Sequence, residues 1–196
     1  MLARRLALWF PLPALLSAAD AFAWGLYTHV FFAQLLIWAV PLADPVLRRA
    51  VRRFPARVMA GACLPDLAIV GRTAGTRAFD SSHRWDAAHD LLAAARDDEA
   101  RACAVGAMSH LWVDIIAHNH FVPAHEHLWG RIPTLTHAAC EWAMDRHVAR
   151  HLFRPPRRLL EADDWLVDYV AGHFDCESAT ARRALRQLGG AETLLR

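Results

Sequence analysis

Hydrophobic residues recur at helical spacing along most of the chain, and the alternation of apolar and polar residues that is typical of strands is almost absent. The strongest pattern covers residues 99–118, where Ala, Met, Leu and Ile return on successive turns. Residues 30–40 are apolar nearly all round, which predicts a buried helix. The pattern therefore predicts an all-α fold, a single-domain multi-helix bundle.

Other segments with helical spacing are separated by Pro, Gly and polar residues. Leu64-Pro65-Asp66 ends one of these helices, and the Gly and Ser residues of 71–82 predict a loop. Residues 119–133 are polar and contain Pro123, Gly130 and Pro133, so we expect a break there as well. The further helices that we expect cover residues 45–54, 56–62, 84–96, 134–151, 163–172 and 178–188.

The tryptophans divide into two groups. Most have the spacing of core residues, so we expect burial; these are Trp38, Trp85, Trp112, Trp142 and Trp165. Trp129 lies in the segment predicted to be broken, which makes it the better candidate for contact with a substrate or a lipid.

Length, composition and charge restrict the class of protein. The 196 residues are 55% hydrophobic, enough for one domain with a core of its own. The 22 basic residues nearly balance the 20 acidic ones, which argues against a dedicated nucleic-acid surface or a polybasic membrane surface. No C-x-x-C pair occurs, which argues against a cysteine-type zinc site. The sequence allows either disulfides or buried thiols for Cys63, Cys103, Cys140 and Cys176.

The first 23 residues have the pattern of a secretory signal peptide. Arg4 and Arg5 precede an apolar stretch, and Ala21-Phe22-Ala23 matches an A-x-A cleavage site. A membrane anchor is the alternative, but the apolar run before Asp20 is about 14 residues long and a span needs roughly 20. We therefore expect an exported protein, periplasmic or secreted, with a mature domain at residues 24–196.

Two pairs of potential metal ligands lie in long predicted helices. His110 and Asp114 are four residues apart, as are His137 and Glu141, so each pair shares one helical face. Two such pairs that face each other across a bundle can build a multinuclear metal site. A set of nitrogen and carboxylate ligands without sulfur suits zinc in a catalytic role.

Three further residues are candidates for the same site. His118 lies on the face of His110 and Asp114 and could be a ligand or support one. His120 could turn back toward the site if the helix ends near Asn119. Asp66 is either an ordinary turn residue or a ligand or base delivered by a rigid loop.

The segment Trp24-Gly25-Leu26-Tyr27-Thr28-His29 resembles the mature start of zinc-dependent phospholipases C and of the related zinc-dependent single-strand nucleases. The Pro-Asp turn, a following His, the H-x-x-x-D helix with a His six residues later, and the H-x-x-x-E helix match that superfamily in order. The resemblance extends from Trp24 to about Glu141 and implies a trinuclear zinc site in the core.

The resemblance also implies how up to three zinc ions are shared. One ion is expected at Asp66, His83, His110 and Asp114, and a second at His120, His137 and Glu141. The third is expected at Trp24 and His29 with Asp114 bridging, where signal removal frees the α-amine of Trp24 for coordination. His83 is preferred to His89 because Ser82-His83-Arg84-Trp85 opens a helix, as the corresponding family ligand does.

The activity implied is hydrolysis of phosphoric ester bonds by a zinc-activated water, with Asp66 as orienting or basic residue. A phospholipid is the leading substrate, with contact to a membrane surface, and no specific nucleic-acid partner is expected. The alternatives are a single-strand nuclease and a non-catalytic zinc-binding helical protein. Glu141 favours the phospholipases, because the nucleases carry Asp at that position.

Overall fold

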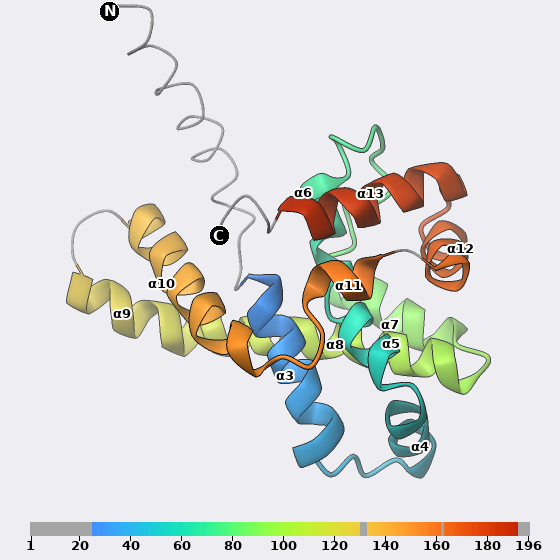
Figure 1. Ribbon diagram of the computed structural model, residues 1–196, viewed down its shortest axis with the longest axis horizontal. Coiled ribbons are helices and arrows are strands. Elements are labelled where there is room, and N and C mark those ends of the chain that lie inside the picture. Colours follow the sequence, from blue (N-terminus) through green and yellow to red (C-terminus); the bar gives the residue numbers. More distant parts are fainter. Residues whose placement is uncertain (1–24, 130–132, 162, 192–196) are drawn as a thin grey trace, which may run out of the picture.

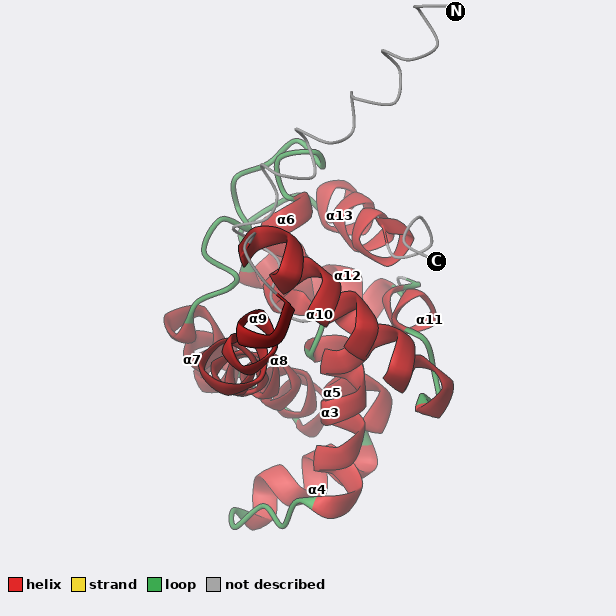
Figure 2. Cartoon of the chain, turned by 90° about the vertical axis from the view of Figure 1, so that its left-hand side faces the viewer, coloured by secondary structure: helices red, strands yellow, loops and turns green. Residues whose placement is uncertain are grey.

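The computed structural model describes residues 25–129, 133–161 and 163–191, and within them it is built of helices without a strand (Figures 1 and 2). The all-α prediction is confirmed. The longer helices are α3 (Leu26–Ala39), α4 (Pro45–Arg53), α5 (Pro55–Gly61), α7 (Trp85–Ala94), α8 (Asp98–Ile116), α9 (Val122–Trp129), α10 (Pro133–Val148), α12 (Asp164–His173) and α13 (Ser178–Ala191). Shorter elements are η2 (Leu64–Asp66), α6 (Leu67–Val70), η3 (Ala117–Phe121), η4 (Ala149–His151) and α11 (Pro156–Leu160).

Helix α8 lies at the centre and contacts α3, α4, α5 and α7. Its N-terminus is capped by Asp97, whose carboxylate accepts a hydrogen bond of 2.8 Å from the backbone N–H of Ala100. Asp98 and Glu99 add negative charge in the first turn, which complements the positive end of the helix dipole. Helices α9 and α10 pack on each other at one end of the molecule, and α12 and α13 pack together at the other (Figure 1).

Two glycines allow α5 and α8 to cross with their backbones in contact. A Cβ on Gly106 would lie 2.0 Å from the carbonyl oxygen of Val58, and one on Gly61 would lie 2.0 Å from that of Cys103. Both positions therefore exclude any side chain at the present helix separation. This crossing holds the segment after α5, which carries Asp66, close to the middle of α8.

The main core lies between α3, α5, α11, α12 and α13, with the ligand-bearing part of α8 to one side. Phe79 and Phe174 meet edge to face at its centre with 5.4 Å between ring centroids. A smaller cluster at Val113 and Ala117 packs against Phe32 and Phe121 and joins α3 to the end of α8. The larger core thus supports the elements from which the polar residues of the next section project.

The predicted break at residues 119–133 is wrong for residues 119–129. The chain continues from α8 through the π-helical stretch η3 into α9. Pro123 does not interrupt this path: it directly follows the π-helical stretch as the second residue of α9, and the fixed φ of proline is compatible with helix. The wider π turn changes the phase of the helix between the two segments.

The predicted burial of the tryptophans is also wrong for three of them. Trp38, Trp112 and Trp142 are 68%, 58% and 48% exposed. Each lies on a helix whose opposite face is buried, so helical spacing alone cannot distinguish the two faces of a nearly apolar helix. Ile115 and Ile116 on α8 are also exposed, which extends the apolar surface around Trp112.

All four cysteines are in the thiol form, and three of them are buried. Among the described residues, no helix combines the length and the apolar character that crossing a bilayer requires. The signal peptide predicted at residues 1–23 lies outside the described residues, so it stays a prediction.

Substitution of Gly106 by Ala is expected to lower the free energy of unfolding by about 1–3 kcal/mol, because the new methyl group forces α5 away from α8. Gly172 in α12 is the matched control, since a Cβ there meets nothing within 4 Å. Gly172→Ala is expected to stabilise the protein by about 0.4–1 kcal/mol. Urea denaturation of both variants measures this, and equal stabilities would contradict the close crossing.

Candidate metal centre

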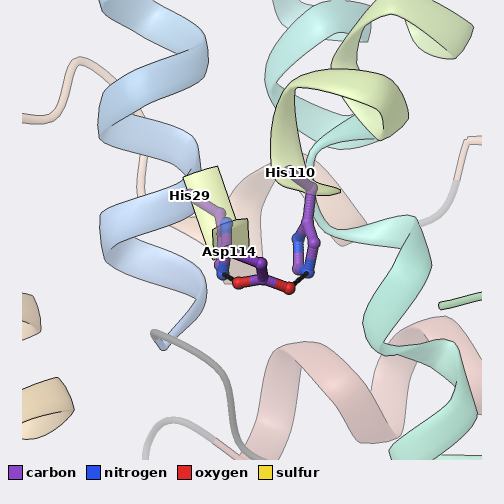
Figure 3. Close-up of side chains that lie close together, drawn as sticks. All are labelled: His29, His110 and Asp114. Atoms are coloured by element: carbon purple, nitrogen blue, oxygen red, sulfur yellow. Dashed lines mark ion pairs between the residues drawn. The ribbon is translucent and has the colours of Figure 1, made fainter. Parts of the chain in front are cut away.

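The carboxylate of Asp114 lies among three imidazole rings. One oxygen, Oδ1, is 3.3 Å from Nε2 of His29, and the other, Oδ2, is 3.3 Å from Nε2 of His110 and 2.6 Å from Nε2 of His83. Figure 3 shows the carboxylate between His29 and His110, with one oxygen directed at each. The rings of His29 and His110 stack with 3.5 Å between centroids, so their Nε2 atoms both face Asp114.

These residues come from separate segments that the fold brings together. His29 projects from the first turns of α3, whereas His110 and Asp114 lie one turn apart on α8. His29 and His110 are completely buried, and Asp114 is 7% exposed. Their donor atoms lie within 4.8 Å of one another, close enough to coordinate a single ion.

A second group joins Asp66 and His83 to His110. Oδ1 of Asp66 lies 3.6 Å from Nδ1 of His83 and 3.6 Å from Nε2 of His110. The Ser82 hydroxyl donates a 2.7 Å hydrogen bond to the carbonyl oxygen of Pro65, which ties the residue before His83 to the residue before Asp66. His89, the alternative to His83, is exposed and belongs to none of the potential metal-binding groups of described residues.

A third group lies between η3 and α10. Nε2 of His137 is 2.7 Å from Oε1 of Glu141, and its ring stacks on that of His118 with 5.0 Å between centroids. The structure thus places His118 in this group, where the family resemblance implies His120. His120 is exposed and lies in none of the groups found among the described residues.

The tautomer of His110 is defined by its second ring nitrogen. Nδ1 donates a 2.7 Å hydrogen bond to the backbone carbonyl of Ala62, at the end of α5. Burial lowers the pKa of His110, and the neighbouring His29 lowers it further. The ring is therefore neutral with the lone pair on Nε2, which is the form of histidine that binds a metal ion.

The three buried carboxyl groups differ in protonation. Burial raises the pKa of Asp66 to about 6 and that of Glu141 to about 7, although their histidine neighbours act in the opposite direction. Burial also acts to raise the pKa of Asp114, but the neighbouring rings of His110, His29 and His83 outweigh it and hold this pKa well below its usual range. Asp114 is thus an anion near neutral pH.

The match to known families bears on this same region. Residues 28–185 match the family described as zinc-dependent phospholipase C. The chain belongs to the zinc-dependent phospholipase C family. The matched segment contains all the candidate ligands except Trp24, which precedes it. Searches of curated proteins and of solved structures give no match to this chain.

The donor atoms fit the zinc that the family name implies. No hydrogen-bond partner among the described residues reaches either ring nitrogen of His29, Nε2 of His110, or Oδ1 of Asp114, although all these atoms are buried. Polar atoms that are buried without partners are costly, and a cation bound among them would remove that cost. Imidazole nitrogen and carboxylate oxygen are the ligands of catalytic zinc sites.

Most of the residues predicted from the sequence meet at this centre. His29, Asp66, His83, His110 and Asp114 form one continuous cluster, and His137 and Glu141 form the group beside it. That each of them binds zinc stays a prediction. Trp24, predicted to supply the third zinc with its amine and carbonyl, lies outside the described residues, as does the side chain of Trp129.

His118 and His120 can be distinguished by zinc content. His118→Gln is expected to lose one zinc ion of the wild-type complement, because its ring stacks on His137 beside Glu141. His120→Gln is expected to keep the full complement. Native mass spectrometry counts the ions, and loss of zinc only in the His120 variant would restore the assignment made from the family resemblance.

The raised pKa of Glu141 makes the stability of the zinc-free protein depend on pH. The folded state keeps a proton on Glu141 up to about pH 7, whereas its ordinary pKa is 4.5, so its contribution to stability is lost as pH rises through that range. Relative to wild type, zinc-free Glu141→Gln is expected to gain up to about 3 kcal/mol between pH 5 and pH 8. Denaturation of both proteins at the two pH values, with a chelator present to remove zinc, measures this difference in stability.

Excess zinc provides the control for the same pair of proteins. Wild type is then expected to be the more stable at pH 8, because the carboxylate binds the ion better than an amide does. Parallel stability curves for the two zinc-free proteins would show that Glu141 ionises normally.

Proposed function

We propose that the protein is a zinc-dependent hydrolase that cleaves a phospholipid phosphodiester by a phospholipase C-type reaction. The observation that supports this most directly is the carboxylate of Asp114, held between three histidines in a chain that belongs to the zinc-dependent phospholipase C family. The products are a phosphomonoester and an alcohol. The membrane-surface contact and the export of the protein belong to the same proposal.

Each group of residues has a defined part in this proposal. Zinc, when bound, lowers the pKa of a coordinated water and offsets the negative charge of the phosphate. His29, His110 and Asp114 hold one ion, Asp66 and His83 extend the set around His110, and His137 with Glu141 supplies the neighbouring set. In this division His110 would be common to the first two sets.

Asp66 is the proposed base. Its Oδ1 lies 3.6 Å from Nδ1 of His83 and 3.6 Å from Nε2 of His110, so it has no short bond to either ring. Burial raises its pKa to about 6. A carboxylate with a pKa nearer to neutrality accepts a proton from water more readily than an ordinary aspartate. Asp66 therefore orients the attacking water and takes up its proton.

The exposed face of α8 suits a lipid better than a nucleic acid. Trp112, Ile115 and Ile116 are exposed on α8, the helix that carries His110 and Asp114. Exposed aromatic and branched apolar side chains favour contact with the interface of a membrane. The nearly balanced charge of the chain provides little attraction for a polyanion such as single-stranded DNA.

Asp66→Asn is expected to lower kcat/KM for phosphatidylcholine by about 100-fold or more, because the amide cannot accept the proton. His89→Gln is the matched control, since His89 is the exposed histidine of the same region, and it is expected to keep wild-type activity. The assay measures release of the phosphomonoester with zinc present, alongside cleavage of single-stranded DNA.

Three outcomes would contradict the proposal in different ways. Full activity of Asp66→Asn would exclude Asp66 as the base. Faster cleavage of DNA than of lipid by the wild type would identify a nuclease. Bound zinc without turnover of either substrate would identify a non-catalytic zinc protein.

A further inference from the structure

Helix α10 carries an acidic residue that has no part in the groups described above. Asp145 lies one turn beyond Glu141, which itself lies one turn beyond His137, so the three side chains share one face of the helix. Instead of the metal centre, Asp145 meets the first turn of α3, which is 117 residues away in the chain.

Asp145 caps the N-terminus of α3. Its Oδ1 accepts a 2.9 Å hydrogen bond from the backbone N–H of Thr28 and a 2.5 Å bond from the Thr28 hydroxyl, and the backbone N–H of Tyr27 is also directed at this carboxyl. Tyr27 and Thr28 are the second and third residues of the helix, whose N–H groups a capping side chain normally satisfies. The residue at the N-cap position is Gly25, which has no side chain to do so.

The approach of Asp145 depends on that glycine. A Cβ on Gly25 would lie 1.9 Å from Oδ2 of Asp145, and the three nearest atoms all belong to the Asp145 carboxylate. The carboxylate could rotate away from such a methyl group only by leaving Thr28, which is completely buried. The position of the Asp145 carboxylate therefore requires a glycine at residue 25.

Each of the two residues joined by this cap, Thr28 and Asp145, lies close to a candidate metal ligand. His29, which faces Asp114 at 3.3 Å, directly follows Thr28. On the other helix, Glu141 is separated from Asp145 by a single turn. The bonds of Asp145 thus connect the helix that carries His29 with the helix that carries His137 and Glu141.

We propose that Asp145 is a positioning residue of the metal centre, which fixes α3 against α10 through Thr28 and so holds His29 in place for the ion shared with Asp114. This inference rests on the proposed zinc site but not on its catalytic activity. A cap that acted on stability alone would leave the zinc affinity of the folded protein unchanged.

The test compares zinc affinity with thermal stability in the full-length chain. Asp145→Ala is expected to weaken the zinc ion held at His29 by about 10–100-fold, the usual effect of removing a residue that supports a ligand. Competition with a chromophoric chelator, at a temperature where every variant is folded, measures the affinity. Asp145→Asn, which keeps an acceptor oxygen for Thr28, is expected to recover most of it.

Asp44→Ala is the matched control for loss of a helix cap. Asp44 accepts bonds from the backbone N–H groups of Val46 and Leu47 at the start of α4, which carries none of the candidate ligands. Both alanine variants are expected to lower Tm, but only Asp145→Ala is expected to weaken zinc binding. A lowered Tm with wild-type zinc affinity in Asp145→Ala would overturn the proposal.

A double-mutant cycle tests the requirement for Gly25. Gly25→Ala alone is expected to weaken zinc about as much as Asp145→Ala, whereas Gly25→Ala added to Asp145→Ala is expected to have little further effect, because the clashing carboxylate is gone. Additive losses would overturn this requirement. Zinc binding without lipid hydrolysis in the wild type would refute the proposed function alone, and absence of zinc binding in the wild type would refute both.

Discussion

The arrangement of helices around the centre depends on the charge of one carboxylate, that of Asp114. Three histidines, two of them from segments outside α8, approach it within 3.3 Å, and these rings keep it ionised in spite of its burial. An isolated buried anion would be far too costly, so the segments that carry His29 and His83 must converge on Asp114, which shares α8 with His110. That requirement places α3 and the chain before α7 on the same side of α8.

Backbone contacts fix the positions of the segments that surround Asp114. Gly61 and Gly106 allow the backbones of α5 and α8 to touch. The C-terminal end of α5 therefore lies close to α8, where the carbonyl oxygen of Ala62 accepts a hydrogen bond from His110. The same segment continues to Pro65, which Ser82 binds through its hydroxyl. Backbone contacts of this kind orient the side chains of the centre, so a change in helix packing would alter the metal geometry even if every ligand remained.

Without a bound ion, the buried polar groups of the metal centre destabilise the fold. Burial raises the pKa of Asp66 to about 6 and that of Glu141 to about 7, and buried atoms of His29 and Asp114 have no hydrogen-bond partners among the described residues. These features destabilise the zinc-free protein near neutral pH. Zinc would reverse each of them at once, and the family to which the chain belongs is zinc-dependent.

Local spacing in the sequence determined the helical class and four of the candidate ligands, and the resemblance to a known family added the others. The i, i+4 pairs His110 with Asp114 and His137 with Glu141 share a helical face whatever the rest of the chain does, because a helix repeats every 3.6 residues. The tertiary structure alone decided which residues of the less regular segments reach the centre. It continued the helix through residues 117–129, which placed His118 rather than His120 beside Glu141. It also placed Asp145 against Thr28, 117 residues away, a contact that no local pattern can encode because it depends on how two helices pack.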